Sequence, residues 1–375
     1  ITLTSGNLVV GSNTLSLNYN GTPIARTSGF ISMSTTSNLE IGDGTQTVTT
    51  TIPNTTFVTP TNFNSLTINR LSGTTNWSNN PITVSGDLVV TSGTTGTFVV
   101  NNAAGTISVG GNTAINNNGR LTVSAANSFS VTGNVDVNNS GIFTVSATNA
   151  NASITGNLNI NNSAQVVASG TNTGANVTIL VGGNFNIGNS LSLNGAASIV
   201  SVGGNVTGSG TINSFANTRR IIMTGSGKTL SSTITYGNVE INSAGNVSLT
   251  GSTTFNGVIT LTSGNLVVGS NTLSLNYNGT PIARTSGFIS MSATSNLVIG
   301  DGTQTATVTI PNSIFVTPTN FNSLTTNRAS GTVNWGNNPI TLSGNANIDA
   351  GSGGYFILNN VTGTMAVGGN LNINS

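Results

Sequence analysis

Two acidic side chains, Glu40 and Asp43, lie three residues apart and are the strongest candidates for acid–base chemistry. Paired carboxylates of this kind hydrolyse glycosidic bonds. A second copy of the segment carries Val298 where the first has Glu40, although it keeps Asp301. The chain also has no histidine and no cysteine, which excludes the usual nucleophilic triads and zinc sites. Because one copy lacks the acid pair, the sequence predicts a protein that is not an enzyme and has no catalytic residues, metal or cofactor.

Charge is sparse along the whole chain. Its 375 residues include 8 Lys and Arg and 7 Asp and Glu, for a formal net charge of +1. This excludes the basic surface that nucleic-acid-binding and membrane-surface proteins use. No apolar run approaches the roughly 18 to 20 residues of a membrane helix. The sequence therefore predicts no nucleic-acid partner and no membrane insertion.

Three charged residues are present in both copies: Arg26, Asp43 and Arg70 correspond to Arg284, Asp301 and Arg328. The Gly-Asp-Gly around Asp43 is similar to Gly/Asp-rich calcium loops. One such carboxylate in each long repeat is too few for a site built mainly from charged ligands. The pattern favours a turn aspartate and a local ion pair or loop clamp, with a partner-binding patch as the alternative.

The chain contains a long tandem repeat. Residues 1–34 recur unchanged at 259–292, and the match continues to the last residue with about three quarters of the aligned positions identical. The sequence therefore divides into one full repeat, 1–258, and the start of the next, 259–375, which continues the first. Tandem arrays of this kind usually build length rather than an active site.

A shorter repeat lies inside the long one, with an apolar residue two positions before a Gly-Asn or Gly-Asp pair and another directly after it. Its glycines recur at a nearly even spacing from Gly86 to Gly204. Alternating stretches such as 121–125 indicate short strands, and Asn/Gly clusters such as 116–119 indicate tight turns. No apolar stripe has helical spacing. The sequence predicts an all-β β-solenoid, or β-helix, of roughly 21–27 residues per coil within a 258-residue super-repeat.

The Gly-Asn pair predicts the structure of a coil corner. Glycine allows a backbone approach that a Cβ would block. Asparagine amides on coils stacked about 4.8 Å apart can form a hydrogen-bonded ladder, each within reach of the next amide or of the adjacent turn backbone. The predicted corners are Gly86, Gly111, Gly133, Gly156, Gly183, Gly204 and Gly369. The predicted ladder is Asn112, Asn134, Asn157, Asn184, Asn205 and Asn370.

Two segments depart from the plain coil pattern. Residues 20–81 hold most of the prolines and many large side chains, among them Phe57, Phe63 and Trp77. Because proline suits edges and turns, we expect wider coils with protruding loops in this Pro/aromatic-rich excursion. Residues 214–240 form the second departure, where charged residues such as Glu240 gather.

The Gly-Asn-Leu and Gly-Gly-Asn motifs, the Asn-rich turns and the near absence of charge resemble bacterial surface β-solenoids. The nearest families are the filamentous-haemagglutinin-like adhesins and the giant repeat adhesins of bacterial envelopes. The resemblance implies a secreted or cell-surface bacterial protein and carries over no binding residues. We expect a structural segment of an extracellular filament, stalk or sheath. The alternative is the shaft of a surface adhesin that binds glycans or neighbouring cells through residues 20–81.

Length and self-association follow from the same pattern. At about 23 residues per coil and about 4.8 Å per coil, one long repeat gives roughly 11 coils and an advance of a little over 50 Å. The open ends of a coil stack have unpaired backbone groups that pair with other chains. We expect both ends of this chain to be internal to a longer array, continued covalently or by end-to-end contact with a second copy. Sides with little charge favour lateral bundling.

Overall fold

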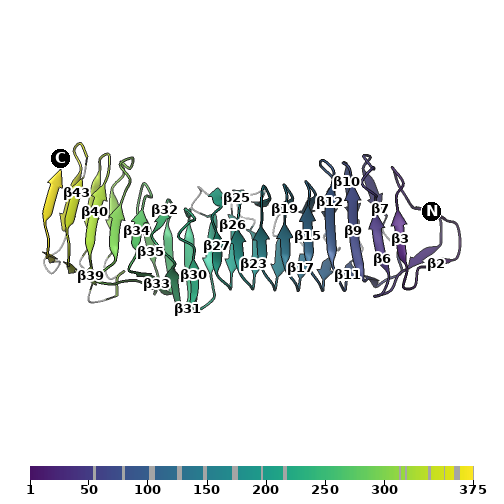
Figure 1. Ribbon diagram of the computed structural model, residues 1–375, viewed down its shortest axis with the longest axis horizontal. Helices are drawn as coiled ribbons and strands as arrows, with labels where there is room; N and C mark the ends of the chain where they lie inside the picture. Colours follow the sequence, from purple (N-terminus) through teal and green to yellow (C-terminus); the bar gives the residue numbers. More distant parts are fainter. Residues whose placement is uncertain are drawn as a thin grey trace. The chain divides into compact units, whose positions relative to one another are not determined.

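The computed structural model describes residues 1–53, 56–77, 81–100, 106–124, 129–146, 150–170, 176–195, 197–213, 218–311, 314–316, 319–336, 339–349, 351–358 and 364–374. Within these ranges the regular structure consists of β-strands, without a helix. Parallel strands stack coil upon coil, which confirms an all-β β-solenoid, here of about 14 turns (Figure 1). No helix of the described residues is long and apolar enough to cross a membrane.

The chain forms two compact units, Ile1–Ser201 and Val202–Ser375. The boundary between them does not coincide with the sequence repeat, which begins again only at Ile259. The units are defined by contacts between coils, whereas the repeat is defined by sequence identity, so the two divisions describe different properties of the chain.

Each coil of the first unit has three sides, and each side is a column of parallel strands. Wall 1 contains β7 (Thr50–Ile52), β10 (Thr74–Trp77), β13 (Thr97–Val100), β16 (Arg120–Val123), β19 (Ile142–Val145), β22 (Gln165–Gly170) and β25 (Ser190–Gly195). Wall 2 contains β8 (Thr61–Phe63), β11 (Ile82–Val84), β14 (Ile107–Val109), β17 (Phe129–Val131), β20 (Asn151–Ile154) and β23 (Asn176–Val181). Wall 3 contains β3 (Thr14–Leu17), β6 (Asn38–Ile41), β9 (Ser65–Arg70), β12 (Leu88–Ser92), β15 (Thr113–Asn116), β18 (Val135–Val137), β21 (Leu158–Ile160) and β24 (Phe185–Ile187).

The first coils of this unit add two shorter pairs, and one strand contains the unit boundary. Strand β1 (Thr2–Leu3) pairs with β4 (Ala25–Arg26), and β2 (Asn7–Val9) pairs with β5 (Phe30–Ser32). Ile31 of β5 forms a further parallel bridge to Phe57. Strand β26 (Ala197–Val202) contains the residues on both sides of the boundary.

The core of the first unit is a continuous column of apolar side chains. Strands alternate one buried and one partly exposed residue, as in β9 and β12, because successive side chains point to opposite faces. Each fully buried aliphatic or aromatic side chain contributes about 1.5–3 kcal/mol. Neighbouring coils place like residues together, for example Phe98, Leu121, Phe143, Val166 and Leu191 along wall 1.

The described residues of the second unit form five columns of parallel strands. Two of them share the long strands β31 (Val239–Leu249) and β33 (Ile259–Gly269): one joins β29 (Arg220–Met223) to β35 (Ile282–Arg284), the other joins β27 (Val206–Gly208) and β30 (Lys228–Leu230) to β36 (Phe288–Met291). The third contains β32 (Thr253–Phe255), β34 (Thr272–Leu275), β37 (Asn296–Ile299), β40 (Ser323–Asn327), β43 (Ala346–Asp349) and β46 (Leu371–Asn374). The others are β38 (Val308–Ile310), β41 (Thr332–Trp335) and β44 (Tyr355–Leu358), and β39 (Thr319–Phe321), β42 (Ile340–Leu342) and β45 (Met365–Val367). Strand β28 (Thr211–Asn213) also belongs to this unit.

Coils at the start of the second unit are shorter than the sequence predicts. Ile221 pairs with Val239, and Val239 pairs with Ile259, so both steps fall below the shortest predicted coil. The 11-residue strands β31 and β33 each extend across two columns without a turn between them. A coil that lacks this turn needs fewer residues. The segment 214–240 is thus a region of compressed coils; its residues 214–217 lie outside the described residues.

The Gly-Asn motif changes column within the second unit. The copy at 204–206 belongs to the column that continues through β30 and the second halves of β31 and β33. The copies at 344–346 and 369–371 belong instead to the column of β34, β43 and β46. The compressed coils therefore shift the phase of the motif by one side of the coil.

The expectation of wider coils in residues 20–81 is wrong. The step from Leu39 to its partner Leu66 has the same length as the step from Leu158 to Phe185 in a plain coil, and the next step, to Leu88, is shorter. The large side chains Phe57 and Trp77 are buried in the coil interior instead of occupying a wider turn. Loop residues 54–55 and 78–80 of this segment lie outside the described residues.

Candidate functional site

The two acidic side chains singled out from the sequence are engaged in separate local contacts. On the outside of β6, Glu40 Oε2 accepts a hydrogen bond of 2.9 Å from Ser16 Oγ. In the following corner loop, Asp43 Oδ1 accepts from the Thr45 backbone and hydroxyl at 3.1 and 2.7 Å, and from Gln46 Nε2 at 2.8 Å. These bonds, led by that from the Thr45 hydroxyl, lower the pKa of Asp43. Asp43 therefore bonds to residues of its own turn, Thr45 and Gln46.

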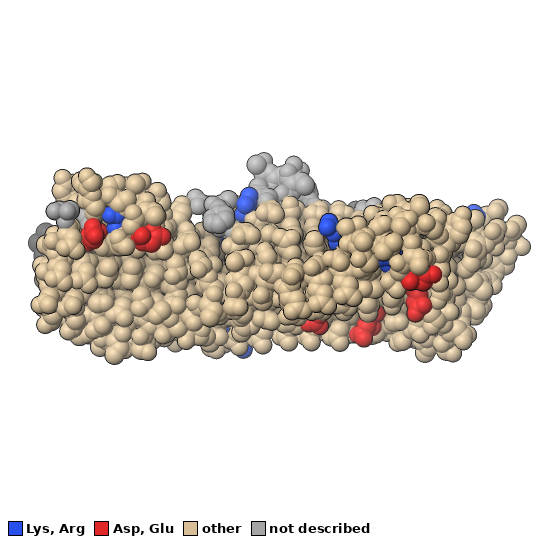
Figure 2. Space-filling view, turned by 45° about the horizontal axis from the view of Figure 1, so that its top comes forward, with Lys and Arg blue, Asp and Glu red and all other residues tan. Residues whose placement is uncertain are grey.

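Charged residues are few on the face shown in Figure 2, where some of them lie in small groups and others lie singly. In the second unit, Glu240 accepts from Arg220 Nε at 2.6 Å and from Thr262 Oγ1 at 2.8 Å. Within the described parts of the chain, no three acidic, His or Cys side chains gather in a way that could hold a metal ion.

The recurring arginines Arg70 and Arg328 are buried and contact backbone carbonyl groups. Arg70 donates from Nη2 to Val48 O and from Nε to Ser72 O, the latter at 3.4 Å. Arg328 donates from Nη2 to the Ala306 carbonyl in the equivalent place. Burial lowers the pKa of both guanidinium groups. Each arginine ties one corner loop to the next, as a loop clamp does.

Four asparagines predicted as a ladder, Asn112, Asn134, Asn157 and Asn184, occupy equivalent corners of successive coils in the first unit, whereas Asn205 and Asn370 lie in different columns of the second unit. In each of the links below, the side-chain Oδ1 accepts a hydrogen bond from the backbone N–H of the next corner, so the donor is the main chain and not a second amide. The links in the first unit run Asn112 to Asn134, Asn134 to Asn157 and Asn157 to Asn184, at 2.9, 2.9 and 2.7 Å. In the second unit Asn205 accepts from Thr229 N at 3.0 Å, and Asn370 N donates to Asn345 Oδ1 at 2.9 Å.

A second file of asparagines, which the sequence reasoning missed, forms amide-to-amide bonds at another corner. Asn138 Nδ2 donates to Asn116 Oδ1 at 2.9 Å, and Asn161 Nδ2 donates to Asn138 Oδ1 at 2.9 Å. A parallel file joins Asn117, Asn139 and Asn162 at 3.2 and 2.7 Å. The residues of this parallel file have φ near +50°, which asparagine tolerates better than most residues. The signal in the sequence is the recurrence of Asn-Asn pairs at coil spacing, which by itself indicates only turns.

Six of the predicted corner glycines, Gly86, Gly111, Gly133, Gly156, Gly183 and Gly369, lie against the corner of the preceding coil. A Cβ on Gly133 would lie 2.5 Å from Gly111 O, and one on Gly183 would lie 2.6 Å from Gly156 O. On the second unit, a Cβ on Gly369 would lie 2.9 Å from Gly344 O. These glycines are required by the close approach of adjacent coils, since none of them has a positive φ.

Replacing Asn157 by leucine is expected to lower the free energy of unfolding by about 1–3 kcal/mol, because the Asn184 N–H would lose its acceptor. The change is measured by urea unfolding followed by circular dichroism. Asn157→Asp is the matched control: Asp87 already fills this role by accepting from Asn112 N at 2.8 Å. An equal loss of unfolding free energy in Asn157→Leu and Asn157→Asp would show that the side-chain acceptor does not stabilise the corner.

One buried tyrosine, Tyr236, is expected to affect the stability of the second unit at high pH. Tyr236 stacks on Phe255 with ring centroids 5.3 Å apart, and its hydroxyl donates to Ser231 O at 3.0 Å. Burial raises the pKa of Tyr236 above its usual value. The folded state therefore favours the neutral phenol, whereas the unfolded chain ionises above about pH 10.

The contribution of Tyr236 is expected to be complete below about pH 10 and to be lost progressively as the pH rises further. Unfolding free energies measured from about pH 9 to about pH 11.5 should thus fall less steeply in Tyr236→Phe than in the parent chain. Tyr19→Phe, at an exposed ring, is the control and should leave the slope unchanged. Identical slopes for all three proteins would contradict the assignment.

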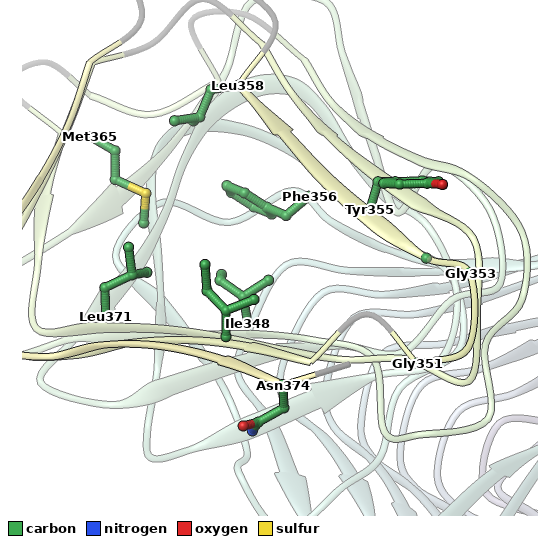
Figure 3. A pocket seen from close by; sticks show the side chains of 11 residues that line it. Ile348, Gly351, Gly353, Tyr355, Phe356, Leu358, Met365, Leu371 and Asn374 are labelled. Atoms are coloured by element: carbon green, nitrogen blue, oxygen red, sulfur yellow. The ribbon is translucent and has the colours of Figure 1, made fainter.

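One hollow of about 580 Å³ lies at the last described coil of the second unit. Figure 3 shows that Phe356, Met365, Leu371 and Ile348 extend into it from different strands. The equivalent strands β13, β14 and β15 in the first unit are covered by β16, β17 and β18. The hollow thus continues the apolar core column, and among its described lining residues only Tyr355 and Asn374 carry polar side-chain groups.

Comparison of the chain with protein-family models, curated proteins and solved structures finds no match. The description of the molecule as a repetitive β-helix therefore depends on its strand register and burial alone.

Proposed function

We propose that this protein is a structural segment of an extracellular filament, stalk or sheath, and that it works without catalysis. The observation that carries the proposal is the continuity of the stack: in each unit, side-chain and backbone hydrogen bonds join corner to corner while apolar residues fill the interior. Repeats that each bury their faces against a neighbour add length at nearly constant stability per repeat.

A bacterial surface location, and a kinship with filamentous-haemagglutinin-like or giant repeat adhesins, are part of the same proposal. They are supported by the Gly-Asn corners, the asparagine files and the near absence of charge. A neutral stack held by amide, hydroxyl and backbone groups depends little on pH or salt, which suits an exposed fibre of a biofilm or cell surface.

Self-association is the partner proposal. Strand edges at the end of a coil stack pair readily with further strands, and sides with little charge lack the repulsion that separates proteins. We therefore propose end-to-end continuation and lateral bundling with further copies.

The structural role is tested with chains that carry one, two and three copies of residues 1–258. Rotary-shadowed electron micrographs should show particles that lengthen by roughly 50 Å per copy at constant width, because each repeat adds about 11 coils. Static light scattering over a concentration series should show assembly that persists at high salt. Compact particles whose length does not follow copy number would refute the proposal.

The alternative function, an adhesin shaft that binds through the aromatic residues of 20–81, is not supported by Phe57, Phe63 and Trp77. All three are buried and contact one another, with Phe57 and Trp77 stacked 5.6 Å apart. A sugar cannot stack on these rings while the coil is folded. Binding by this segment would need other side chains on its outer surface.

A further inference from the structure

One corner asparagine in each copy of the long repeat has its side-chain oxygen held by two consecutive backbone N–H groups. In the first unit, Asn20 Oδ1 accepts from Thr47 N and Val48 N, both at 2.9 Å. In the second unit, Asn278 Oδ1 accepts from the equivalent backbone groups at 2.9 and 2.7 Å. Consecutive N–H groups that point to one atom form a concave site suited to an anion. A neutral amide oxygen therefore occupies a place in which a carboxylate would bind better.

Each of these asparagines is followed by a glycine, Gly21 or Gly279. The backbone nitrogen of such a glycine can attack the side-chain carbon of the asparagine, because no Cβ blocks the approach. The attack places negative charge on Oδ1, and N–H donors already aimed at that oxygen stabilise the charge as it develops. Asn20 and Asn278 are exposed, so water reaches both side chains. The Gly21 N–H donates to Tyr19 O at 3.1 Å, and this bond within one turn must break before the attack.

We propose that Asn20 and Asn278 convert spontaneously to aspartate in the folded chain. The Gly21 nitrogen loses its proton and forms a bond to Asn20 Cγ, and the bond from Cγ to Nδ2 breaks as ammonia leaves. Water then adds to Cγ of the five-membered imide and breaks the new C–N bond, which restores the peptide and leaves a carboxylate at position 20. Opening at the other carbonyl would give isoaspartate, whose longer main chain moves the carboxylate away from the two N–H groups. We therefore expect aspartate as the main product.

The new carboxylate would also provide a counter-charge for a buried arginine. Val48, whose N–H donates to Asn20, accepts a hydrogen bond from Arg70 Nη2 through its carbonyl. Arg70 and Arg328 are buried, and no carboxylate of the described residues forms an ion pair with either. Among those residues Arg328 Nε and Nη1 also have no hydrogen-bond partner. A buried cation without an opposite charge is costly, whereas a carboxylate held by backbone N–H groups makes strong, charge-assisted hydrogen bonds.

Two other Asn-Gly pairs of the chain serve as internal comparisons, Asn118-Gly119 and Asn256-Gly257. Within the described residues, neither asparagine accepts a backbone N–H on its side-chain oxygen. The Gly119 N–H donates to Asn116 O at 2.8 Å, which holds the attacking nitrogen in place. The dipeptide is the same at all these sites, so a difference in rate between them reports the folded structure and not the sequence.

The test incubates the full chain in a mildly alkaline buffer, once folded and once in urea, and follows each Asn-Gly pair by peptide mass spectrometry. In the folded chain, Asn20 and Asn278 should convert at least about tenfold faster than Asn118 and Asn256, because two oxyanion donors act at the first pair of sites. In urea all four should convert at similar rates. Gly21→Ala should slow conversion at Asn20, while Asn278 in the same chain is the matched control and should keep its rate.

The double variant Asn20→Asp with Asn278→Asp imitates the product and should unfold at a higher urea concentration than the parent chain. Asn118→Asp with Asn256→Asp adds the same charge away from paired N–H donors and should show no such gain. Equal rates at all four sites in the folded chain would overturn the proposal, as would isoaspartate as the main product or a double product variant less stable than the parent. Circular dichroism of each variant establishes that the fold is intact. The proposed structural role is tested separately by length per copy, which does not depend on this conversion.

Discussion

Replacing Trp77 by alanine is expected to lower the free energy of unfolding of the first unit by about 3–5 kcal/mol, the largest effect of any single substitution proposed for this chain. Trp77 is 2% exposed. Its ring stacks on Phe57 with centroids 5.6 Å apart and an interplanar angle of 15°, and meets the edge of Phe63 at 6.0 Å and 79°. Alanine would remove the transfer energy of the indole and leave a cavity between two aromatic rings.

The second copy provides an internal comparison for this change. Trp335 stacks on Phe315 at 5.7 Å and 7°, and Trp335→Ala should produce a loss of similar size in the second unit. In each variant the remaining tryptophan reports on the other unit by fluorescence, while circular dichroism in a urea series follows the whole chain. Tyr19→Ala, at a residue that is 67% exposed, is the control and should change stability by less than about 0.5 kcal/mol. A loss below about 1 kcal/mol in both tryptophan variants would contradict the view that these aromatic clusters are core.

The coil itself was predictable from the sequence because its signals are local. Inward residues repeat every second position, as in Leu121 and Val123, and corners repeat as Gly-Asn at coil spacing. At Gly133–Asn134 the glycine allows the close approach of the preceding coil, and the asparagine backbone N–H bonds to the asparagine of that coil. The pair therefore indicates a coil corner rather than a loop of arbitrary shape.

The position of the aromatic residues was not predictable in the same way. Proline in residues 20–81 indicated loops, but Phe57, Phe63 and Trp77 are drawn inside by the apolar surface they bury. Phe30, of the same residue type and in the same segment, is oriented outward because its neighbour Ile31 takes the inward position. Which of two adjacent apolar residues is buried depends on the register of the strand, and register is set by the coils on both sides.

The compressed coils and the partners of the ladder bonds also required the structure. Coil length in the segment that contains Val239 depends on whether strands pass through a corner without a turn, and the residues of β31 include Ser243, Ala244 and Gly245, which on their own favour a turn. Likewise, composition alone does not tell whether Asn157 bonds to the next side chain or to the next backbone N–H. The donor is determined by the distance between corners, which glycine makes short.

That short distance leads to the second large expected effect. Replacing Gly183 by alanine is expected to lower the free energy of unfolding by about 1–3 kcal/mol, as overpacking does at a site that cannot relax. The added Cβ would lie 2.6 Å from both Gly156 O and Asn157 Oδ1. The same change would strain the hydrogen bond from Gly183 N to Gly156 O, now 2.9 Å, and the ladder bond from Asn184 N to Asn157 Oδ1, now 2.7 Å. One added methyl group would therefore weaken two hydrogen bonds at the same corner, one between backbone groups and one of the asparagine ladder.

Hydrogen exchange separates this local effect from a general loss of stability. In Gly183→Ala, amide protection should fall most at the corners around Gly156 and Gly183 and less in coils farther along the stack, because each coil contacts mainly its neighbours. Thr132→Ala, at an exposed position beside the corner glycine Gly133, adds no atom to the contact between coils and should leave exchange unchanged. If Gly183→Ala is as stable as Thr132→Ala, the coils can move apart at this corner without a loss of free energy. The spacing between coils would then not require glycine at position 183.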